Sequence, residues 1–487
     1  MAESLRDRSL TGFLWVLVDK VGSSLANFIV TIILARLLAP ADFGLVAMVM
    51  VFFEISSSFI QSGIGFALVR EKTITELDKS TVFIFNLVTA LAFYGLLYLT
   101  APWIAGFFGQ PVLTAIVRIM GINLIVSALS IIQHAILTQQ IDFRVQTKVR
   151  MGAVLASGIC AVVMAFNGWG VWSLVARIGV MELITTVLFW VINPWRLTLR
   201  FSTSSFRRLF GFGSVILAEA LIDKVFRHLI QILIGKFYSA ATLGFFTQAN
   251  NFCNMASNSF LQAIQKVTYP VLARLQDDKV KLKDGYRQLI GVSSFIIIPV
   301  MALMGVLAEP LIVSLAGEKW LPSVPLLRLL CLGGAIYHLN AINLDVLLVL
   351  GRVDLSLKLE VIKKAILAVA LIIGIQFGIY GMVVGQVAAT YIALFINTYY
   401  SDLLLRYALA EQMKDVAPSI LFSVGTGAVV FILLQYTNTA ALYQLLWAPV
   451  VGTGIYLTLH HWAKTREMAL IKTFIIPRTI GFFTPKL

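Results

Sequence analysis

The chain has 487 residues, of which 59% are hydrophobic and 13% are charged, and its formal net charge is +14 at pH 7. A soluble domain has roughly 45 to 50% apolar and about 25% charged residues, so the composition excludes that class and predicts an all-α polytopic membrane protein. The basic residues are scattered over short loops, whereas nucleic-acid binding needs a basic face on a soluble domain, so we expect no nucleic acid as a partner.

Apolar segments separated by charged or Gly- and Pro-containing turns predict about 14 transmembrane helices, because most of them reach the roughly 20 residues needed to cross the bilayer. Asp19 and Lys20 interrupt the first apolar run, so we expect no cleavable signal peptide there. In chain order the predicted spans cover residues 10–37, 41–66, 80–108, 112–138, 148–167, 169–193, 209–235, 239–266, 286–316, 322–350, 357–377, 379–405, 417–436 and 442–462.

Lysine and arginine alternate between the two sides of the predicted membrane. The N-terminal segment, every second loop and the C-terminal tail carry most of them. The opposite loops hold only Arg36, Arg118, Lys236, Lys319 and Arg328. Cytoplasmic loops are enriched in Lys and Arg, so we expect a multi-pass protein of the bacterial inner membrane with both termini in the cytoplasm.

Several landmarks recur in the second half of the chain, at offsets of 200 to 212 residues. The matching pairs are Gly44 and Gly244, Gly109 and Gly317, Asp142 and Asp354, and Gly170 and Gly378. Six helices, an even number, are thus duplicated in the same orientation, which predicts a parallel pseudo-repeat. We therefore expect one six-helix bundle at residues 1–200, a second at 201–410, and two additional helices with a basic cytoplasmic tail at 411–487.

Some chemistry is not expected from this sequence. It contains no glycine-rich phosphate loop, so ATP is not expected as a partner. Cys160, Cys253 and Cys331 fall inside predicted spans, as buried apolar residues do, so we expect no metal site and no disulfide. No loop is long enough for a separate catalytic domain, and we expect neither an enzyme nor a bound cofactor.

Two stretches carry a family resemblance. They read ILARLLAPADFG from Ile33 to Gly44 and GEKWLPSVPLLRLL from Gly317 to Leu330. With the twelve-plus-two arrangement of spans, residues 5 to about 410 resemble bacterial polysaccharide flippases, the Wzx-like polysaccharide transporter family of the MOP exporter superfamily. The sequence is most similar to the branch of the colanic acid and teichuronic acid exporters.

The resemblance implies two six-helix bundles in a V around a central cavity. It also implies an alternating-access flippase that moves a polyprenyl-pyrophosphate-linked oligosaccharide from the cytoplasmic to the outer leaflet. That transport would serve exopolysaccharide or O-antigen biosynthesis, with the lipid bilayer and glycan polymerases as further expected partners.

Charged residues inside spans are costly and rarely face lipid, so they are candidates for function. Our candidates for a cationic lumen that contacts the substrate are Lys20, Arg177, Lys224 and Arg227. The alternative for Lys20 and Lys224 is a cation that snorkels to the interface or pairs with a neighbouring carboxylate. Glu54 and Asp345 lack an opposite charge nearby in sequence. Either could couple transport to an ion, since a buried carboxyl can bind a proton, or could be a hydrogen-bonded structural group.

Amide side chains recur at helical spacing in the span that covers residues 239–266. Asn250, Asn254 and Asn258 lie on one face, and amides that face lipid would go unsatisfied, so this face predicts a wetted wall that binds sugar hydroxyls.

Two other classes remain open. A multidrug or small-solute antiporter of the same superfamily is the alternative carrier, but the cations Arg177, Lys224 and Arg227 argue against the acidic lumen that would favour it. A membrane glycan polymerase or ligase is the enzyme alternative, and the short outer loops argue against it.

Overall fold

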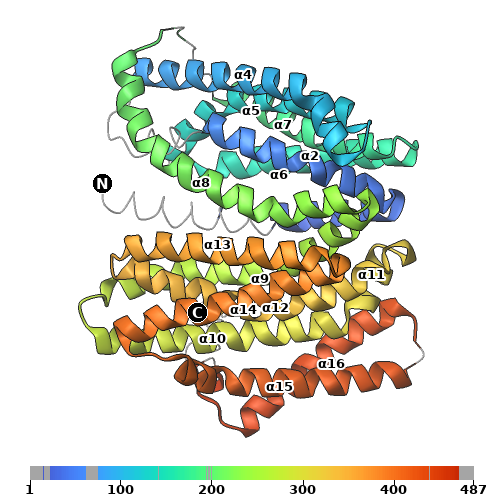
Figure 1. The fold of residues 1–487 in the computed structure, drawn as a ribbon, viewed down its shortest axis with the longest axis vertical. Coiled ribbons are helices and arrows are strands. Elements are labelled where there is room, and N and C mark those ends of the chain that lie inside the picture. Colours follow the sequence, from blue (N-terminus) through green and yellow to red (C-terminus); the bar gives the residue numbers. More distant parts are fainter. Residues whose placement is uncertain are drawn as a thin grey trace, which may run out of the picture. The chain divides into compact units, whose positions relative to one another are not determined.

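The computed structural model is helical throughout its regular elements (Figure 1). It describes Trp15 and residues 22–61, 75–140, 142–193, 195, 198, 200–437 and 439–470. The chain divides into two compact units, Met1–Gly244 and Phe245–Leu487, and each is described here by itself.

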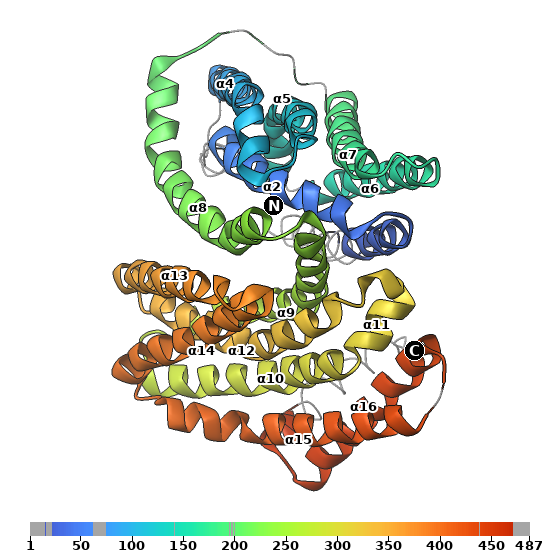
Figure 2. The same cartoon turned by 45° about the vertical axis from the view of Figure 1, so that its right-hand side comes forward.

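Unit 1 begins with the helical segment Gly22–Leu37. It continues with α2 (Pro40–Gln61), α4 (Glu76–Phe108), α5 (Leu113–Gln139), α6 (Phe143–Phe166), α7 (Val171–Ile192), α8 (Thr203–Phe237) and the first turn of α9 (Ala240–Arg274). Figure 2 shows α8 as a curved helix, and it packs against both α4 and α2.

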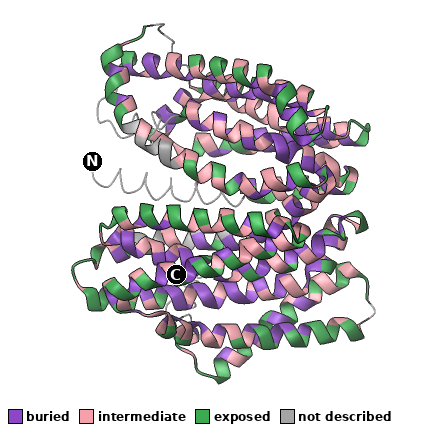
Figure 3. Ribbon diagram, viewed as in Figure 1, coloured by how far each residue is buried: buried purple, intermediate pink, exposed green. Residues whose placement is uncertain are grey.

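Unit 2 holds the rest of α9 and nine further elements. These are α10 (Lys279–Val306), α11 (Ala308–Leu315), the 3-10 turn η1 (Glu318–Trp320), α12 (Ser323–Val349), α13 (Val353–Ile375), α14 (Gly378–Leu405), α15 (Leu409–Tyr436), α16 (Ala441–Trp462) and α17 (Arg466–Leu470). α10 and α12 are largely buried within the unit, whereas α16 is largely exposed (Figure 3).

Ten of the described helices are long and apolar enough to cross a membrane. They are α2, α4, α5, α6, α7, α10, α12, α14, α15 and α16. Large apolar side chains such as Leu99, Phe166 and Phe377 are exposed on these units, as contact with lipid requires. The chain is therefore an all-helical, multi-pass membrane protein. A total of 14 spans stays a prediction.

One predicted span is broken in the structure. The apolar stretch 286–316 forms two helices, and α10 and α11 meet at Leu307. The cause is Pro310 in the first turn of α11, since proline has no N–H to donate and its ring clashes with the carbonyl four residues earlier. That carbonyl belongs to Val306, the last residue of α10.

Two pairs of the repeated glycines have positive φ. Gly109 and Gly317 have φ of 66° and 97°, and Gly170 and Gly378 have φ of 54° and 76°. Side chains at such φ values are strained, so glycine is favoured where the chain turns between helices at these four places. Gly109 and Gly317 differ in ψ, at 27° and 167°, so the pairs share positive φ and not one backbone conformation.

Polar side chains hold the helices of unit 2 together. Asn397 Nδ2 donates to Asn340 Oδ1 at 2.9 Å, and Ser401 Oγ donates to Asn343 Oδ1 at 2.6 Å. Gln412 of α15 donates to the same Asn343 oxygen at 3.1 Å. This buried network joins α12 to α14 and α15, because amides removed from water need hydrogen-bond partners.

Candidate functional site

A half-buried guanidinium in unit 1 has only neutral partners among the described residues. Arg177 of α7 donates from Nη1 to Thr31 Oγ1 at 3.1 Å and from Nη2 to Asn27 Oδ1 at 2.9 Å and to the Asn27 carbonyl oxygen at 3.3 Å. Asn27 and Thr31 lie one helical turn apart on the segment Gly22–Leu37. Among the described residues no carboxylate forms an ion pair with Arg177.

Arg177 can therefore bind an anion. A guanidinium carries five N–H donors, and the three hydrogen bonds leave two of them. The remaining donors are Nε–H and one Nη1–H, which lie on different edges of the guanidinium, so each can donate one hydrogen bond to an anion. A partly buried charge without a counter-ion is costly and favours such a ligand.

A second cluster joins α2 to α8. Glu54 Oε2 lies 3.0 Å from His228 Nε2, and His228 Nδ1 lies 2.7 Å from Gln231 Oε1. The Nζ of Lys224 donates to the backbone oxygen of Glu54 at 3.0 Å. The side chain of His228 is 9% exposed and that of Glu54 is 31% exposed. Both imidazole nitrogens face oxygen acceptors, an arrangement that suits the doubly protonated ring.

His228 is not among the residues predicted from the sequence. Glu54 has no opposite charge nearby in sequence, but in three dimensions His228 contacts its carboxylate and Lys224 contacts its backbone oxygen. A sequence pattern within α8 could have predicted His228 as a candidate. Lys224, His228 and Gln231 follow one another at i, i+4 and i+7, which places three polar residues on one helical face.

The other predicted cations have different surroundings. Arg227 pairs with Asp223 one turn earlier on α8, and both side chains are largely exposed. Such a pair on the same helix contributes little to stability, so Arg227 is accessible to another anion. Lys20 lies outside the described residues.

The predicted polar wall and the second carboxylate lie in unit 2. On α9, Asn250 is half-buried and Asn254 is exposed, while the side chain of Asn258 lies outside the described part. Asp345 of α12 accepts a hydrogen bond at 2.6 Å from Gln265 Nε2 of α9. No Lys or Arg with a described side chain forms an ion pair with Asp345.

The repeated pair Gly44 and Gly244 forms a close helix crossing within unit 1. A Cβ atom on Gly44 would lie 1.8 Å from the carbonyl oxygen of Ala240, and one on Gly244 would lie 1.9 Å from that of Pro40. Each glycine is the fifth residue of its helix and meets the first residue of the other. The first turns of α2 and α9 thus touch backbone to backbone.

The sequence is similar to known proteins of polysaccharide biosynthesis. The sequence model of the family described as polysaccharide biosynthesis protein matches residues 33–325. The teichuronic acid biosynthesis protein TuaB of Bacillus subtilis (strain 168) is 24% identical over 414 residues, which cover 84% of this chain and 81% of that protein. The lipopolysaccharide biosynthesis protein WzxC of Escherichia coli (strain K12) is 24% identical over 402 residues and 81% of either chain.

Two solved structures share the fold. The lipid II flippase MurJ in an inward closed conformation superposes with a TM-score of 0.74 at 15% identity, over 92% of this chain and 98% of that one. An inward-facing multidrug resistance MATE family transporter of the MOP superfamily gives a TM-score of 0.64 at 14% identity, over 81% and 98% of the two chains. At these identities the likeness establishes the fold alone.

Proposed function

Because the chain belongs to the polysaccharide biosynthesis protein family, we propose that it is a flippase for a polyprenyl-pyrophosphate-linked oligosaccharide. It moves this substrate from the cytoplasmic to the outer leaflet of a bacterial inner membrane and catalyses no covalent reaction. The names of its relatives, a teichuronic acid and a lipopolysaccharide biosynthesis protein, support this substrate class. The fold shared with a lipid II flippase supports the transport step.

The architecture that goes with this function has 14 spans. Four described helices add to the ten apolar ones: Gly22–Leu37, α8, α9 and α13. The fourteen helices together form a first bundle within residues 1–200, a second bundle within residues 201–410, and two additional helices with a cytoplasmic tail within residues 411–487. Both termini lie in the cytoplasm, as the distribution of Lys and Arg favours.

The observation that carries the proposal is the unpaired guanidinium of Arg177. The only charge that every substrate of this class shares is the pyrophosphate between lipid and sugar. A phosphate oxygen accepts charge-assisted hydrogen bonds from a guanidinium, and Arg177 has Nε–H and one Nη1–H left to donate. Asn27 and Thr31 hold the guanidinium in place for that contact.

Further residues serve the same substrate. Lys224, Arg227 and Lys20 add positive charge for the pyrophosphate, and Asn250, Asn254 and Asn258 offer amides to sugar hydroxyls. Glu54 couples transport to a proton, because its contact with His228 gives this carboxylate a partner that responds to its charge. Asp345, which has a neutral partner in Gln265, is the second candidate for coupling.

The test uses the purified chain in proteoliposomes that contain a polyprenyl-pyrophosphate oligosaccharide with a fluorescent sugar. Dithionite added outside bleaches only outward-facing label, so flipping is read as bleaching beyond the initial half. We expect the wild type to flip and Arg177→Gln to flip about tenfold or more slowly, since a hydrogen bond to a charged group contributes roughly 1.5 to 3 kcal/mol. Arg177→Lys should recover only part of the rate.

The matched control is Arg118→Gln, which removes a half-buried arginine that stacks over Tyr98 in the same unit. This variant should flip at the wild-type rate. Equal rates for Arg177→Gln and the wild type would refute the pyrophosphate contact. A wild-type chain that leaves the lipid in place but exports a fluorescent cation would instead establish the small-solute antiporter.

A further inference from the structure

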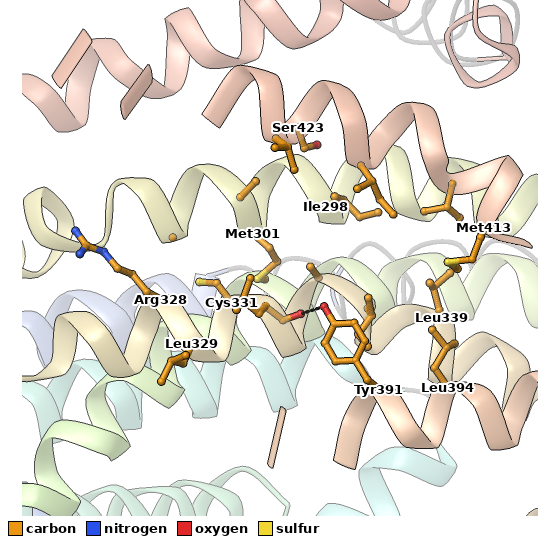
Figure 4. A pocket seen from close by; sticks show the side chains of 18 of the residues that line it. Ile298, Met301, Arg328, Leu329, Cys331, Leu339, Tyr391, Leu394, Met413 and Ser423 are labelled. Carbon is orange, nitrogen blue, oxygen red and sulfur yellow. Dashed lines mark hydrogen bonds between the residues drawn. The ribbon is translucent and has the colours of Figure 1, made fainter. Parts of the chain in front are cut away.

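Unit 2 contains a groove of about 770 Å³ between α10, α12, α14 and α15 (Figure 4). This volume lies in the range of roughly 300 to 1,000 Å³ that is typical of ligand sites. Apolar side chains form nearly all of its wall, among them Met301, Ile336, Leu339, Leu394, Phe395 and Val416. The Tyr391 hydroxyl is not available to a ligand as a donor, because it donates to the Leu332 carbonyl oxygen at 3.3 Å.

The groove has one charged end. Arg328 lies at one extreme and Met413 at the other (Figure 4). The nearest carboxylate to Arg328 is that of Glu309, 3.7 Å from Nη2, and the two side chains are 47% and 59% exposed. An exposed pair at this distance is weak, so the guanidinium can bind an anion at the mouth of the groove.

The length of the groove matches one leaflet. Its lining residues on α12 run from Arg328 to Leu339, which is about 16 Å at the helical rise of 1.5 Å per residue. Half of a hydrocarbon core of about 30 Å is a similar distance. The groove thus has a cation at one end and an apolar wall as long as one leaflet is deep. This arrangement is complementary to a phospholipid, which has a phosphate at one end and an acyl chain beyond it.

We propose that this groove binds an anionic glycerophospholipid, with one acyl chain between α12 and α15 and its phosphate at Arg328. The bound acyl chain fills the space between α12 and α15. It thereby holds the additional C-terminal helices against the rest of unit 2. The polyprenyl tail of the substrate fits less well. The cations that we assign to its pyrophosphate, Arg177, Lys224, Arg227 and Lys20, all belong to unit 1, whereas this groove has its own cation.

The test measures lipid binding and needs no transport. The full chain in nanodiscs is irradiated with phosphatidylglycerol that carries a diazirine on one acyl chain, and labelled peptides are located by mass spectrometry. We expect labelling of α10, α12 and α15 at the groove. Phosphatidylglycerol should label more than phosphatidylcholine with the same chain, and Arg328→Gln should reduce that preference by about tenfold or more, as expected for a lost hydrogen bond between charged groups.

A second variant fills the groove without disturbing its wall. Gly305 lines the groove, and a Cβ atom there would meet only Cys331 Cβ, at an ordinary 3.6 Å. Gly305→Leu should abolish labelling, whereas the control Gly425→Leu on exposed α15 backbone, where a Cβ meets nothing within 4 Å, should not. Equal labelling of the two variants would overturn the proposal. So would a diazirine polyprenyl phosphate that outcompetes the phospholipid at the same peptides.

Discussion

Gly44 and Gly244 permit a backbone approach that no other residue allows. Each would place a Cβ atom within 2 Å of a carbonyl oxygen of the opposite helix, far inside van der Waals contact. Backbone atoms cannot swing aside as a long side chain can, so any substitution must push the first turns of α2 and α9 apart. The pair thus marks a close contact between two helices that are far apart in sequence.

Alanine at either position should therefore destabilise the protein. Overpacking of this kind costs about 1 to 3 kcal/mol, which we expect to see in Gly44→Ala and Gly244→Ala as a lower midpoint of thermal unfolding in detergent. The control is Gly95→Ala in α4, where a Cβ atom meets nothing within 4 Å. There the helix gains roughly 0.5 to 1 kcal/mol from the lower backbone entropy of alanine. An equal loss of stability in all three variants would contradict the prediction that close backbone contact at Gly44 and Gly244 causes the destabilisation.

The sequence predicts single residues unevenly. Glycines at matching offsets pointed to a repeat, and the shared positive φ of Gly170 and Gly378 is consistent with it. Arg177 could be chosen as a candidate because a charge inside an apolar span is conspicuous by itself. Its partners Asn27 and Thr31 could not, since they lie about 150 residues away and only the packing of α7 on the first helix brings them together.

The length of each apolar segment predicts that a helix is present, but the residues at which a helix begins, ends or breaks depend on local capping and proline residues. The spans predicted at α5, α7, α12 and α14 lie within a few residues of the observed helices, and the span 41–66 begins within one residue of α2 but ends outside the described residues. α4 begins at Glu76, before its predicted start, because Thr75 and Asp78 form a capping box. The break between α10 and α11 depends on a proline that hydropathy alone treats as part of one apolar run.

Contacts between elements also determine which charges act together. Glu54 of α2 and His228 of α8 form a pair that neither helix reveals by itself, and Lys224 of α8 lies beside it. We expect Glu54→Gln and His228→Gln each to weaken the dependence of flipping on an imposed pH gradient. The double variant should be no worse than the worse single one, because residues in contact show coupling of about 0.5 to 3 kcal/mol.

Proteoliposome flipping at several pH gradients measures this effect. His134→Gln is the matched control, since it changes a histidine in α5 of the same unit whose ring packs against Phe189. Independent, additive losses in the double variant would separate Glu54 from His228 in the transport cycle.

At the scale of the whole molecule the chain divides between Gly244 and Phe245, inside α9. α8 belongs to unit 1 because it packs on α2 and α4. The sequence repeat instead predicts a boundary near residue 200, where the second set of six helices begins, and that boundary stays a prediction. A repeat in sequence reports how the chain was duplicated. The boundary between compact units instead depends on how the helices pack, and that packing involves side chains from both copies of the repeat.

The crossing of α2 and α9 gives the last prediction. Leu37 and Phe237 each lie three residues before the first residue of a crossing helix, so both are at the same end of unit 1. They belong to the first and second predicted bundles. If transport requires these bundles to rock apart at this end, a disulfide between Leu37→Cys and Phe237→Cys should block flipping, and reduction should restore it.

The control is a disulfide inside one bundle. A Cβ atom on Gly158 of α6 would lie 2.6 Å from Val30 Cγ2 of the first helix, so Val30→Cys and Gly158→Cys are placed to join helices that move together. Both pairs are made in a chain whose Cys160, Cys253 and Cys331 are replaced. Rocking of rigid bundles requires that the first disulfide stop flipping and the second leave it unchanged. Unchanged flipping with an efficiently formed bond between positions 37 and 237 would mean that the substrate crosses without separation of these helices.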